Sequence, residues 1–589
     1  MSDFIYSKKP ISKGELTKKI EAIYSKEKPQ IKEFHGEWGS LAVSQNLYNG
    51  FQVLETTEYI CTVIGGPILH FQDNIFLTKD DMCTGTSSIL NRWLSGDIRW
   101  DEDLSGPFNI LIINKVTEEI ICVTDLMSFI PVFIYQDDIG NSMLSTHVDA
   151  LAKTSRQIDR IDIVSQIDFI LHGVVTFPYT TYTNLRQLFP ASEHKILSKL
   201  KNIQSSAYWL PSDNVRYKSI NKAAQDLRQG LQNYTEAVVK DMPHIAQFIS
   251  GGEDSRFLSA ILPQDRIRDS FVFLDFMNRE GKVAQKAAEA YGANFNIATR
   301  SKAHYIEILP KCTELVGSGF QYHHVHTFGF HKSCKLDEYP AVFGGLFSDA
   351  LLKGARVKKV RGTSRFPFIP QIKKQNYTPD QTLKSNVFKK EVLSEIKIRR
   401  QTHLSYVKSL RGESAEEWFE LWPSSMNMNI PNLYGNRRLF RSYEPFMSKD
   451  VVKVSASVPQ SWKLNRRLFH KAAKPMLKPT KWLLHSNGHM PYFPWYVNSF
   501  IRFIMWSTQI LGKKTGIIKG NQKSWGDWNF VMNSKEWQTA KKNYSKNVTT
   551  LETALVDKDV EKLFIDGNLS KSQLKNLMQV LYTLHSNRK

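Results

Sequence analysis

Residues 244–262 read HIAQFISGGEDSRFLSAIL, in which a strand, a glycine turn and a helix follow one another. The apolar run 244–249 predicts a buried strand, and the pattern from Arg256 onward predicts a helix. Gly251 and Gly252 let the backbone turn sharply and come close to a ligand. Backbone amides in such a turn, together with the helix N-terminus, form an anion-binding site. Because strand-like and helix-like segments continue to alternate beyond it, this stretch predicts a parallel α/β sheet with a phosphate-binding loop.

The side chains of the loop carry the same prediction further. Ser250 and Ser255 would donate hydroxyl hydrogen bonds to phosphate oxygens. Asp254 would repel a phosphate unless a Mg²⁺ ion lay between them, so it is predicted to be a metal ligand. The alternative is a glycine turn before an ordinary helix, with Asp254 in its favourable first turn. The complete pattern Ser-Gly-Gly-x-Asp-Ser between a strand and a helix favours nucleotide binding.

This pattern resembles the pyrophosphate loop of asparagine synthetases and related ATP pyrophosphatases. The resemblance implies that the chain binds ATP and Mg²⁺ and adenylates a substrate carboxylate. Pyrophosphate would be released, and an amine would then displace AMP to form an amide bond. In the family the strand after the loop lines the adenine and ribose pocket, so Phe273 and Leu274 are candidates for that contact, although each also suits an ordinary core strand.

A second glycine turn, 342–349 (VFGGLFSD), resembles the family pattern G-x-G-[AS]-D and retains Gly345, Ser348 and Asp349. Asp254 and Asp349 would then share Mg²⁺ and the pyrophosphate oxygens. Two carboxylates that meet at a switch point of a parallel sheet are a reasonable way to hold hydrated magnesium. Leu346 departs from the family, which places a catalytic tyrosine or glutamate there.

The acceptor side of the pocket is expected in 441–463, where Glu444 would orient or deprotonate the attacking amine. The structural alternative for Glu444 is that it caps a neighbouring element or pairs with a neighbouring arginine. The family's phosphate-neutralising lysine aligns with Asn487, and Lys471, Lys478 or Lys481 are candidates to replace it.

The length of 589 residues predicts two domains, which we place at 1–215 and 216–589. Runs such as 59–64, 108–113, 120–123 and 132–135 predict a mostly antiparallel first half. This half resembles the glutaminase domain of the synthetases, which implies an α+β Ntn-type sandwich before the α/β pyrophosphate-loop synthetase domain. A working glutaminase needs an N-terminal cysteine. Because the chain begins Met-Ser-Asp and its first cysteine is Cys61, glutamine hydrolysis is expected to be absent.

If the first domain does not release ammonia from glutamine, the nucleophile is expected to be free ammonia or an amine of the substrate. Relatives without the cysteine include β-lactam synthetases and lasso peptide cyclases, so the resemblance implies lactam or macrolactam closure in peptide natural-product biosynthesis. The expected partners are ATP, a carboxylate-bearing substrate such as a precursor peptide, and a leader-peptide-binding or protease protein. Three alternatives remain: ammonia-dependent amidation of a sugar acid or aspartate, a tRNA-modifying pyrophosphate-loop enzyme, and a non-enzymatic adaptor.

Composition and charge limit which of these functions the chain can have. The formal charge of +21 suits nucleic acid, an anionic surface or an acidic substrate, but equally a lysine-rich proteome. Nucleic acid is disfavoured because no RNA-binding module is recognisable. The basic run 353–365 would hold an acidic peptide or form a solvated face. Five scattered cysteines and the absence of a spanning apolar run indicate a cytoplasmic protein without membrane insertion; the run 500–506 contains Arg502 and predicts a packed helix.

Overall fold

The computed structural model describes residues 3–586 except 25–28, 80, 197–202, 215, 361–371, 373–386, 487, 515–520, 523, 547 and 566. Asn487 therefore lies outside the described residues, as do Arg361 and Arg365 of the basic run.

The first half contains two six-stranded antiparallel sheets, as its β-like runs predicted. In spatial order, the first has β12 (Leu185–Gln187), β10 (Phe133–Gln136), β11 (Ser142–Ser145), β1 (Phe4–Ser7), β3 (Gly39–Ser44) and β2 (Ile31–Gly36). The second has β14 (Gln204–Ala207), β13 (Ser192–Ile196), β9 (Ile120–Thr124), β8 (Phe108–Asn114), β5 (Tyr59–Gly65) and β4 (Leu54–Glu55).

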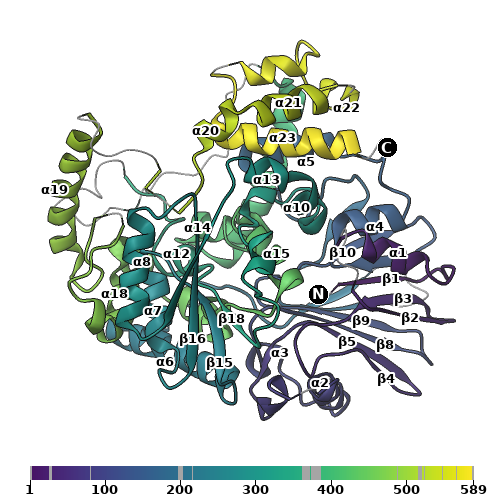
Figure 1. The fold of residues 1–589 in the computed structure, drawn as a ribbon. Coiled ribbons are helices and arrows are strands. Elements are labelled where there is room, and N and C mark those ends of the chain that lie inside the picture. The colour runs from purple at the N-terminus through teal and green to yellow at the C-terminus, as the bar shows by residue number, and fades with distance from the viewer. Residues whose placement is uncertain are drawn as a thin grey trace.

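The two sheets pack face to face, with helices on both outer faces. Successive side chains point to opposite faces, so Phe4 and Tyr6 pack between the sheets while Ile5 faces the helices. Helices α1 (Glu15–Glu21) and α4 (Val148–Thr154) cover the first sheet, and α2 (Thr84–Leu94) covers the second (Figure 1). Every central strand is therefore buried on both sides, which explains its nearly continuous apolar sequence.

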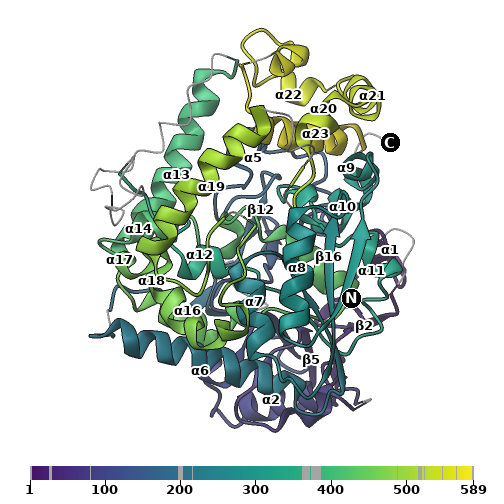
Figure 2. The same ribbon diagram turned by 60° about the vertical axis from the view of Figure 1, so that its left-hand side comes forward.

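The second half is built on a five-stranded sheet whose strands are all parallel. Its order is β17 (Asn294–Thr299), β16 (Ile267–Leu274), β15 (His244–Phe248), β18 (Val342–Phe343) and β19 (Ser442–Tyr443). From β15 the chain adds strands first on one side and then on the other, so β15 and β18 flank the topological switch point. Helices α7 (Glu253–Ile261) and α8 (Arg279–Ala290) connect β15 to β16 and β16 to β17 (Figure 2).

The C-terminal helices pack across the two halves. Helix α23 (Lys571–Ser586) packs against α5 (Ile163–His172) of the first half, and both share a buried cluster with the start of α13 (Lys390–Leu410). The predicted domain boundary falls in the connection between β14 and α6 (Ile220–Val239).

The apolar run 500–506 lies in α19 (Trp495–Lys514), which is a helix as predicted. The packing expected for it is wrong at Phe500 and Phe503, whose side chains are more than half exposed. In the part of the chain that the structure describes, none of the helices has both the length and the apolar character needed to cross a membrane.

Candidate active site at the ends of the parallel strands

The first glycine turn leaves the carboxyl end of β15 and enters α7. The Gly251 amide donates to Glu280 Oε1 of α8 at 2.7 Å, so a buried carboxylate holds the turn in place. The Ser250 and Ser255 hydroxyls lie 3.1 Å apart, and Ser255 Oγ also donates to the Ser250 carbonyl. Arg256 anchors the segment 483–484 over the turn by donating to two of its carbonyls.

The first turn of α7 begins after a glycine and contains two acidic residues. Gly252 is the N-cap and has no side chain to cap the helix, and Glu253 and Asp254 lie in the first turn. The backbone N–H groups at the start of a helix lack intrahelical partners, and the helix dipole favours negative charge near them.

The second glycine turn leaves the carboxyl end of the adjacent strand β18 and enters α12 (Ser348–Leu352). Phe347 stands where the family pattern has a glycine, yet its φ of 70° is the left-handed conformation that glycine favours. Among the described residues, the buried Ser348 Oγ meets no hydrogen-bond partner.

Asp254 and Asp349, predicted to converge, both contact the ammonium of Lys353. Lys353 Nζ touches Asp254 Oδ1 and lies 2.8 Å from Asp349 Oδ1 and 3.3 Å from Glu253 Oε1. Arg466 Nη1 lies 3.0 Å from Glu253 Oε1. Three carboxylates and two cations thus meet at the switch point.

The charges of this cluster set its pKa values. Burial raises the pKa of Asp254 to about 6, although the nearby Lys353 ammonium acts to lower it. Lys353 lowers the pKa of Asp349 below its usual range. Burial opposes ionisation of Glu253, but Arg466 and Lys353 hold its pKa well below the usual value. Asp254 is therefore the carboxyl of the three that protonates most readily.

The predicted magnesium ion does not fit between Asp254 and Asp349 in this arrangement. Mg²⁺ binds carboxylate oxygens at roughly 2.0–2.1 Å, and the Lys353 ammonium occupies that position. Among the described residues, no group of three or more His, Cys, Asp or Glu side chains is arranged to hold a metal ion.

Glu444 lies directly beneath the second glycine turn. Its carboxylate accepts hydrogen bonds from the Leu346 amide at 3.0 Å and the Ser442 hydroxyl at 3.1 Å. Burial raises the pKa of Glu444 to about 7. Among the described contacts Glu444 has no arginine partner, so the pairing alternative for this residue is wrong.

The remaining candidates are placed away from the acidic cluster. Lys471 Nζ bonds Asn221 Oδ1 on α6, and Lys481 lies over the rings of Trp482 and Tyr492. Lys478 is exposed. Leu274 is fully buried, and the Phe273 ring stacks on Phe330 with 4.5 Å between centroids. Neither of these two contacts points to an adenine pocket.

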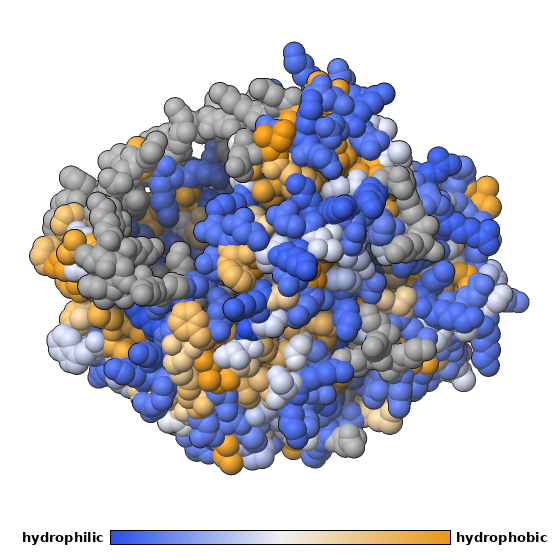
Figure 3. All heavy atoms as spheres, turned by 45° about the horizontal axis from the view of Figure 1, so that its top comes forward, coloured by the Kyte–Doolittle hydropathy of each residue, from blue (hydrophilic) through white to orange (hydrophobic). Residues whose placement is uncertain are grey.

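A cavity of about 1220 Å³ opens beside the acidic cluster. Its basic wall includes Lys353, Arg356, Lys359 and Arg466, and its apolar wall includes Phe493 and residues of α19. The side chain of Asp349 is 71% exposed and faces this cavity. Exposed hydrophobic side chains of α19 include Phe500, Phe503 and Ile504. Figure 3 shows hydrophobic side chains at the left edge of the face, and others in its lower middle and at its upper right.

Sequence reasoning missed Lys353 as part of the site, counting it only in the basic run. The signal was present, because Lys353 follows Asp349 by four residues and such pairs meet on a helix. It also missed Arg466 and Asn465, which adopt left-handed conformations with φ of 59° and 49° at the kink before α18 (Arg467–Ala473). Asn465 carries a weak local signal, because asparagine adopts this conformation more often than most residues, whereas Arg466 carries none.

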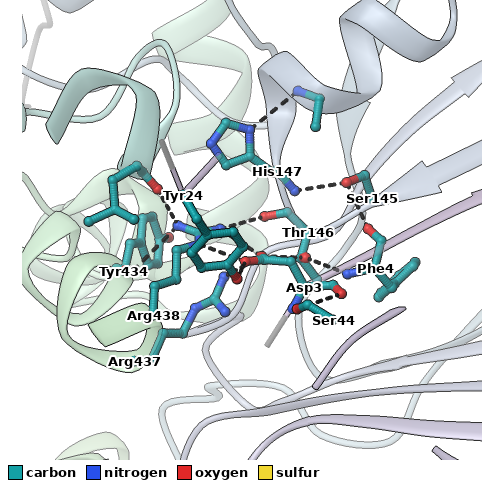
Figure 4. Close-up of polar contacts among 12 residues, drawn as sticks. Asp3, Phe4, Tyr24, Ser44, Ser145, Thr146, His147, Tyr434, Arg437 and Arg438 are labelled. Carbon is teal, nitrogen blue, oxygen red and sulfur yellow. Dashed lines mark hydrogen bonds and ion pairs between the residues drawn. The ribbon is translucent and has the colours of Figure 1, made fainter. Parts of the chain in front are cut away.

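Asp3 is fully buried between the two halves (Figure 4). Asp3 accepts hydrogen bonds from Thr146, Tyr24, Arg437 and Arg438, of which the two arginines belong to α15 (Pro431–Leu439). Burial alone would raise the pKa of Asp3, but Arg438 and Arg437 hold it well below its usual range.

Cys61, the first cysteine in the sequence, does not offer an alternative nucleophile. Cys61 lies within β5 and is fully buried, and burial raises the pKa of its thiol to about 12. All five cysteines are free thiols. A reactive thiolate requires a lowered pKa and access to the substrate, and Cys61 has neither.

No family model and no curated protein matches this chain. Among solved structures, glutamine phosphoribosylpyrophosphate amidotransferase from B. subtilis, complexed with ADP and GMP, has 10% identity and a TM-score of 0.23. The alignment covers 50% of this chain and 65% of that one, slightly less than two thirds. The allosteric regulatory enzyme of purine biosynthesis has 9% identity, a TM-score of 0.24, and coverage of 60% and 75%. Similarity at this level assigns neither a family nor an activity to the chain.

Proposed function

We propose that this chain is an ATP-dependent enzyme that activates a substrate carboxylate as an adenylate and forms an amide bond. The observation that carries the proposal is the meeting of Asp254 and Asp349 around Lys353, between the ends of β15 and β18. In open α/β sheets, ligands bind in the crevice outside the carboxyl ends of the strands at such a switch point.

In the first step, a carboxylate oxygen attacks the α-phosphorus of ATP, the bond from that phosphorus to the bridging oxygen breaks, and pyrophosphate leaves. The amine nitrogen then attacks the acyl carbon, AMP leaves, and the amine proton passes to solvent. In this proposal, the backbone N–H groups in the first turn of α7 would stabilise the leaving diphosphate. The buried Ser348 hydroxyl is a further donor at this point.

In this proposal, Glu444 is a positioning residue that holds the second glycine turn in place. It is buried under the second turn and is not among the residues that line the cavity. Its hydrogen bond to the Leu346 amide holds the turn that carries Asp349. We therefore propose that Glu444 orients the site and does not accept the amine proton.

The cavity supports a substrate larger than a free amino acid. Pockets for drug-sized ligands occupy roughly 300–1,000 Å³, and this cavity exceeds that range. Its basic wall suits a carboxylate, and its apolar wall suits the remainder of a peptide. We propose an acidic side chain of a precursor peptide as the carboxylate and an amine of the same peptide as the nucleophile, which gives a lactam ring. Ammonia-dependent amidation of a sugar acid would use the same first step.

The test is exchange of labelled pyrophosphate into ATP, with acidic peptides, aspartate and glucuronate each offered as the carboxylate. Exchange is expected with at least one of them and is expected to fall at least about 100-fold in Asp254→Asn and Asp349→Asn. Asp265→Asn is the matched control, because Asp265 is an exposed aspartate beyond the other end of α7. If pyrophosphate exchange persists in both variants, Asp254 and Asp349 do not belong to the site of adenylation.

One observation favours a second function, a non-enzymatic relative of such enzymes. The Gly251 amide is already bonded to Glu280, and an ammonium lies between the two aspartates. A protein with its own charges in these places can keep the fold without binding nucleotide. Failure of ATP to bind, measured by calorimetry, together with the absence of exchange would select this function.

A further inference from the structure

Lys353 is held in a fixed position by the turn that precedes it. It directly follows the short helix α12, which begins after the left-handed Phe347. The Lys353 side chain is 5% exposed, and its ammonium lies 4.7 Å from the centroid of the Phe469 ring. The ammonium is therefore enclosed by an aromatic face and by the carboxylates of the site.

The Lys353 ammonium is surrounded by negative charge. Three carboxylates, from Glu253, Asp254 and Asp349, lie within ion-pair distance of it. Two of these residues come from the first turn of α7 and one from α12, so Lys353 joins the two glycine turns.

Without the ammonium, Asp254 and Asp349 would be two carboxylates directed at one position. Mg²⁺ and Mn²⁺ prefer carboxylate oxygens. A metal ion bonded to both aspartates would lie against Lys353 Nζ, and two cations in contact repel each other strongly in a buried site. The ammonium and a divalent ion therefore exclude each other.

We propose that Lys353 is the built-in cation of this site and takes the place of a divalent metal ion between Asp254 and Asp349. Lys353 lies in the same site as the proposed function, but its role as a built-in cation does not depend on amide-bond formation. Because the test below measures Mn²⁺ binding without nucleotide, it can fail or succeed independently of the proposed reaction.

The test is titration of the full chain with Mn²⁺ alone, followed by electron paramagnetic resonance of the free ion. Wild type is expected to show no saturable site below a concentration on the order of 1 mM. Lys353→Met keeps the length of the side chain and removes its charge, and it is expected to bind one Mn²⁺ at least about tenfold more tightly than wild type. Lys353→Met combined with Asp349→Asn is expected to lose that site.

Lys359→Met is the matched control, because Lys359 lines the same cavity but is not paired with the three carboxylates. It should bind Mn²⁺ as weakly as wild type. Saturable binding to wild type that disappears in Asp349→Asn overturns the proposal, as does a folded Lys353→Met that binds none. If Lys353→Met unfolds because three carboxylates are left together, Mn²⁺ is expected to restore its cooperative thermal transition, and failure of that rescue also overturns the proposal.

Discussion

Glu444 illustrates how a single buried residue can report on the site. Its carboxylate is enclosed by the second glycine turn and β19, and its two described hydrogen-bond donors are neutral. Burial without a cation partner raises the pKa of Glu444 to about 7 from an ordinary value of 4.5. The protonated form is therefore favoured in the folded chain.

This shift predicts how stability depends on pH. Between the unfolded and folded pKa values the folded state binds more protons, so the stability contributed by Glu444 is present below pH 4.5 and is lost as pH rises through 7. The loss is expected to reach about 3 kcal/mol, an order-of-magnitude figure from the shift. The free energy of unfolding, measured with urea from pH 5 to 8, should therefore depend less on pH in Glu444→Gln than in wild type. The same pH dependence in both proteins would contradict the raised pKa.

At the scale of the element, the second glycine turn requires close approach of Glu444 to the backbone. A Cβ atom on Gly344 would lie 2.3 Å from Glu444 Oε1. Gly344→Ala is therefore expected to lower the free energy of unfolding by about 1–3 kcal/mol. Gly412→Ala is the control, since the nearest atom to its Cβ is 3.8 Å away, and it should change stability by less than about 0.5 kcal/mol. Equal urea unfolding midpoints for Gly344→Ala and wild type would show that the turn accepts the added Cβ atom without loss of stability.

At the scale of the whole molecule, the buried Asp3 joins the two halves. Its carboxylate pairs with Arg437 at 3.0 Å and Arg438 at 2.8 Å, and all three side chains are almost fully buried. Removal of one partner leaves the other charges uncompensated, which costs about 3–5 kcal/mol. Asp3→Asn is expected to lower stability by this amount from pH 7 to pH 4. The difference should begin to shrink as pH falls below about 3.8, where Asp3 protonates in the unfolded chain, and should go on shrinking down to the lowered pKa of the folded chain.

Asp73→Asn is the control for Asp3→Asn. Asp73 also joins the halves, through an ion pair with Lys240, but both side chains are more than half exposed. An exposed pair contributes about 0–1 kcal/mol, so this variant should unfold close to wild type by tryptophan fluorescence. A large effect of Asp73→Asn, or a negligible effect of Asp3→Asn, would show that burial does not set the strength of this junction.

Local patterns in the sequence determined the two fold types and the positions of both glycine turns. The predicted strands at 59–64, 108–113, 120–123, 132–135 and 244–249 correspond to β5, β8, β9, β10 and β15. Such patterns succeed because apolar runs and the backbone freedom of glycine act over a few neighbouring residues. The roles assigned to Asp254, Asp349 and the other site residues stay predictions.

Only the tertiary structure decided which groups surround the two aspartates. The sequence offered Lys471 and Lys481 for the missing lysine, whereas the fold places both elsewhere and brings Lys353 to the carboxylates. Likewise, nothing near Asp3 in the sequence indicates that arginines from α15 enclose it. These contacts depend on the packing of elements far apart in the chain, and short-range patterns carry no information about such packing.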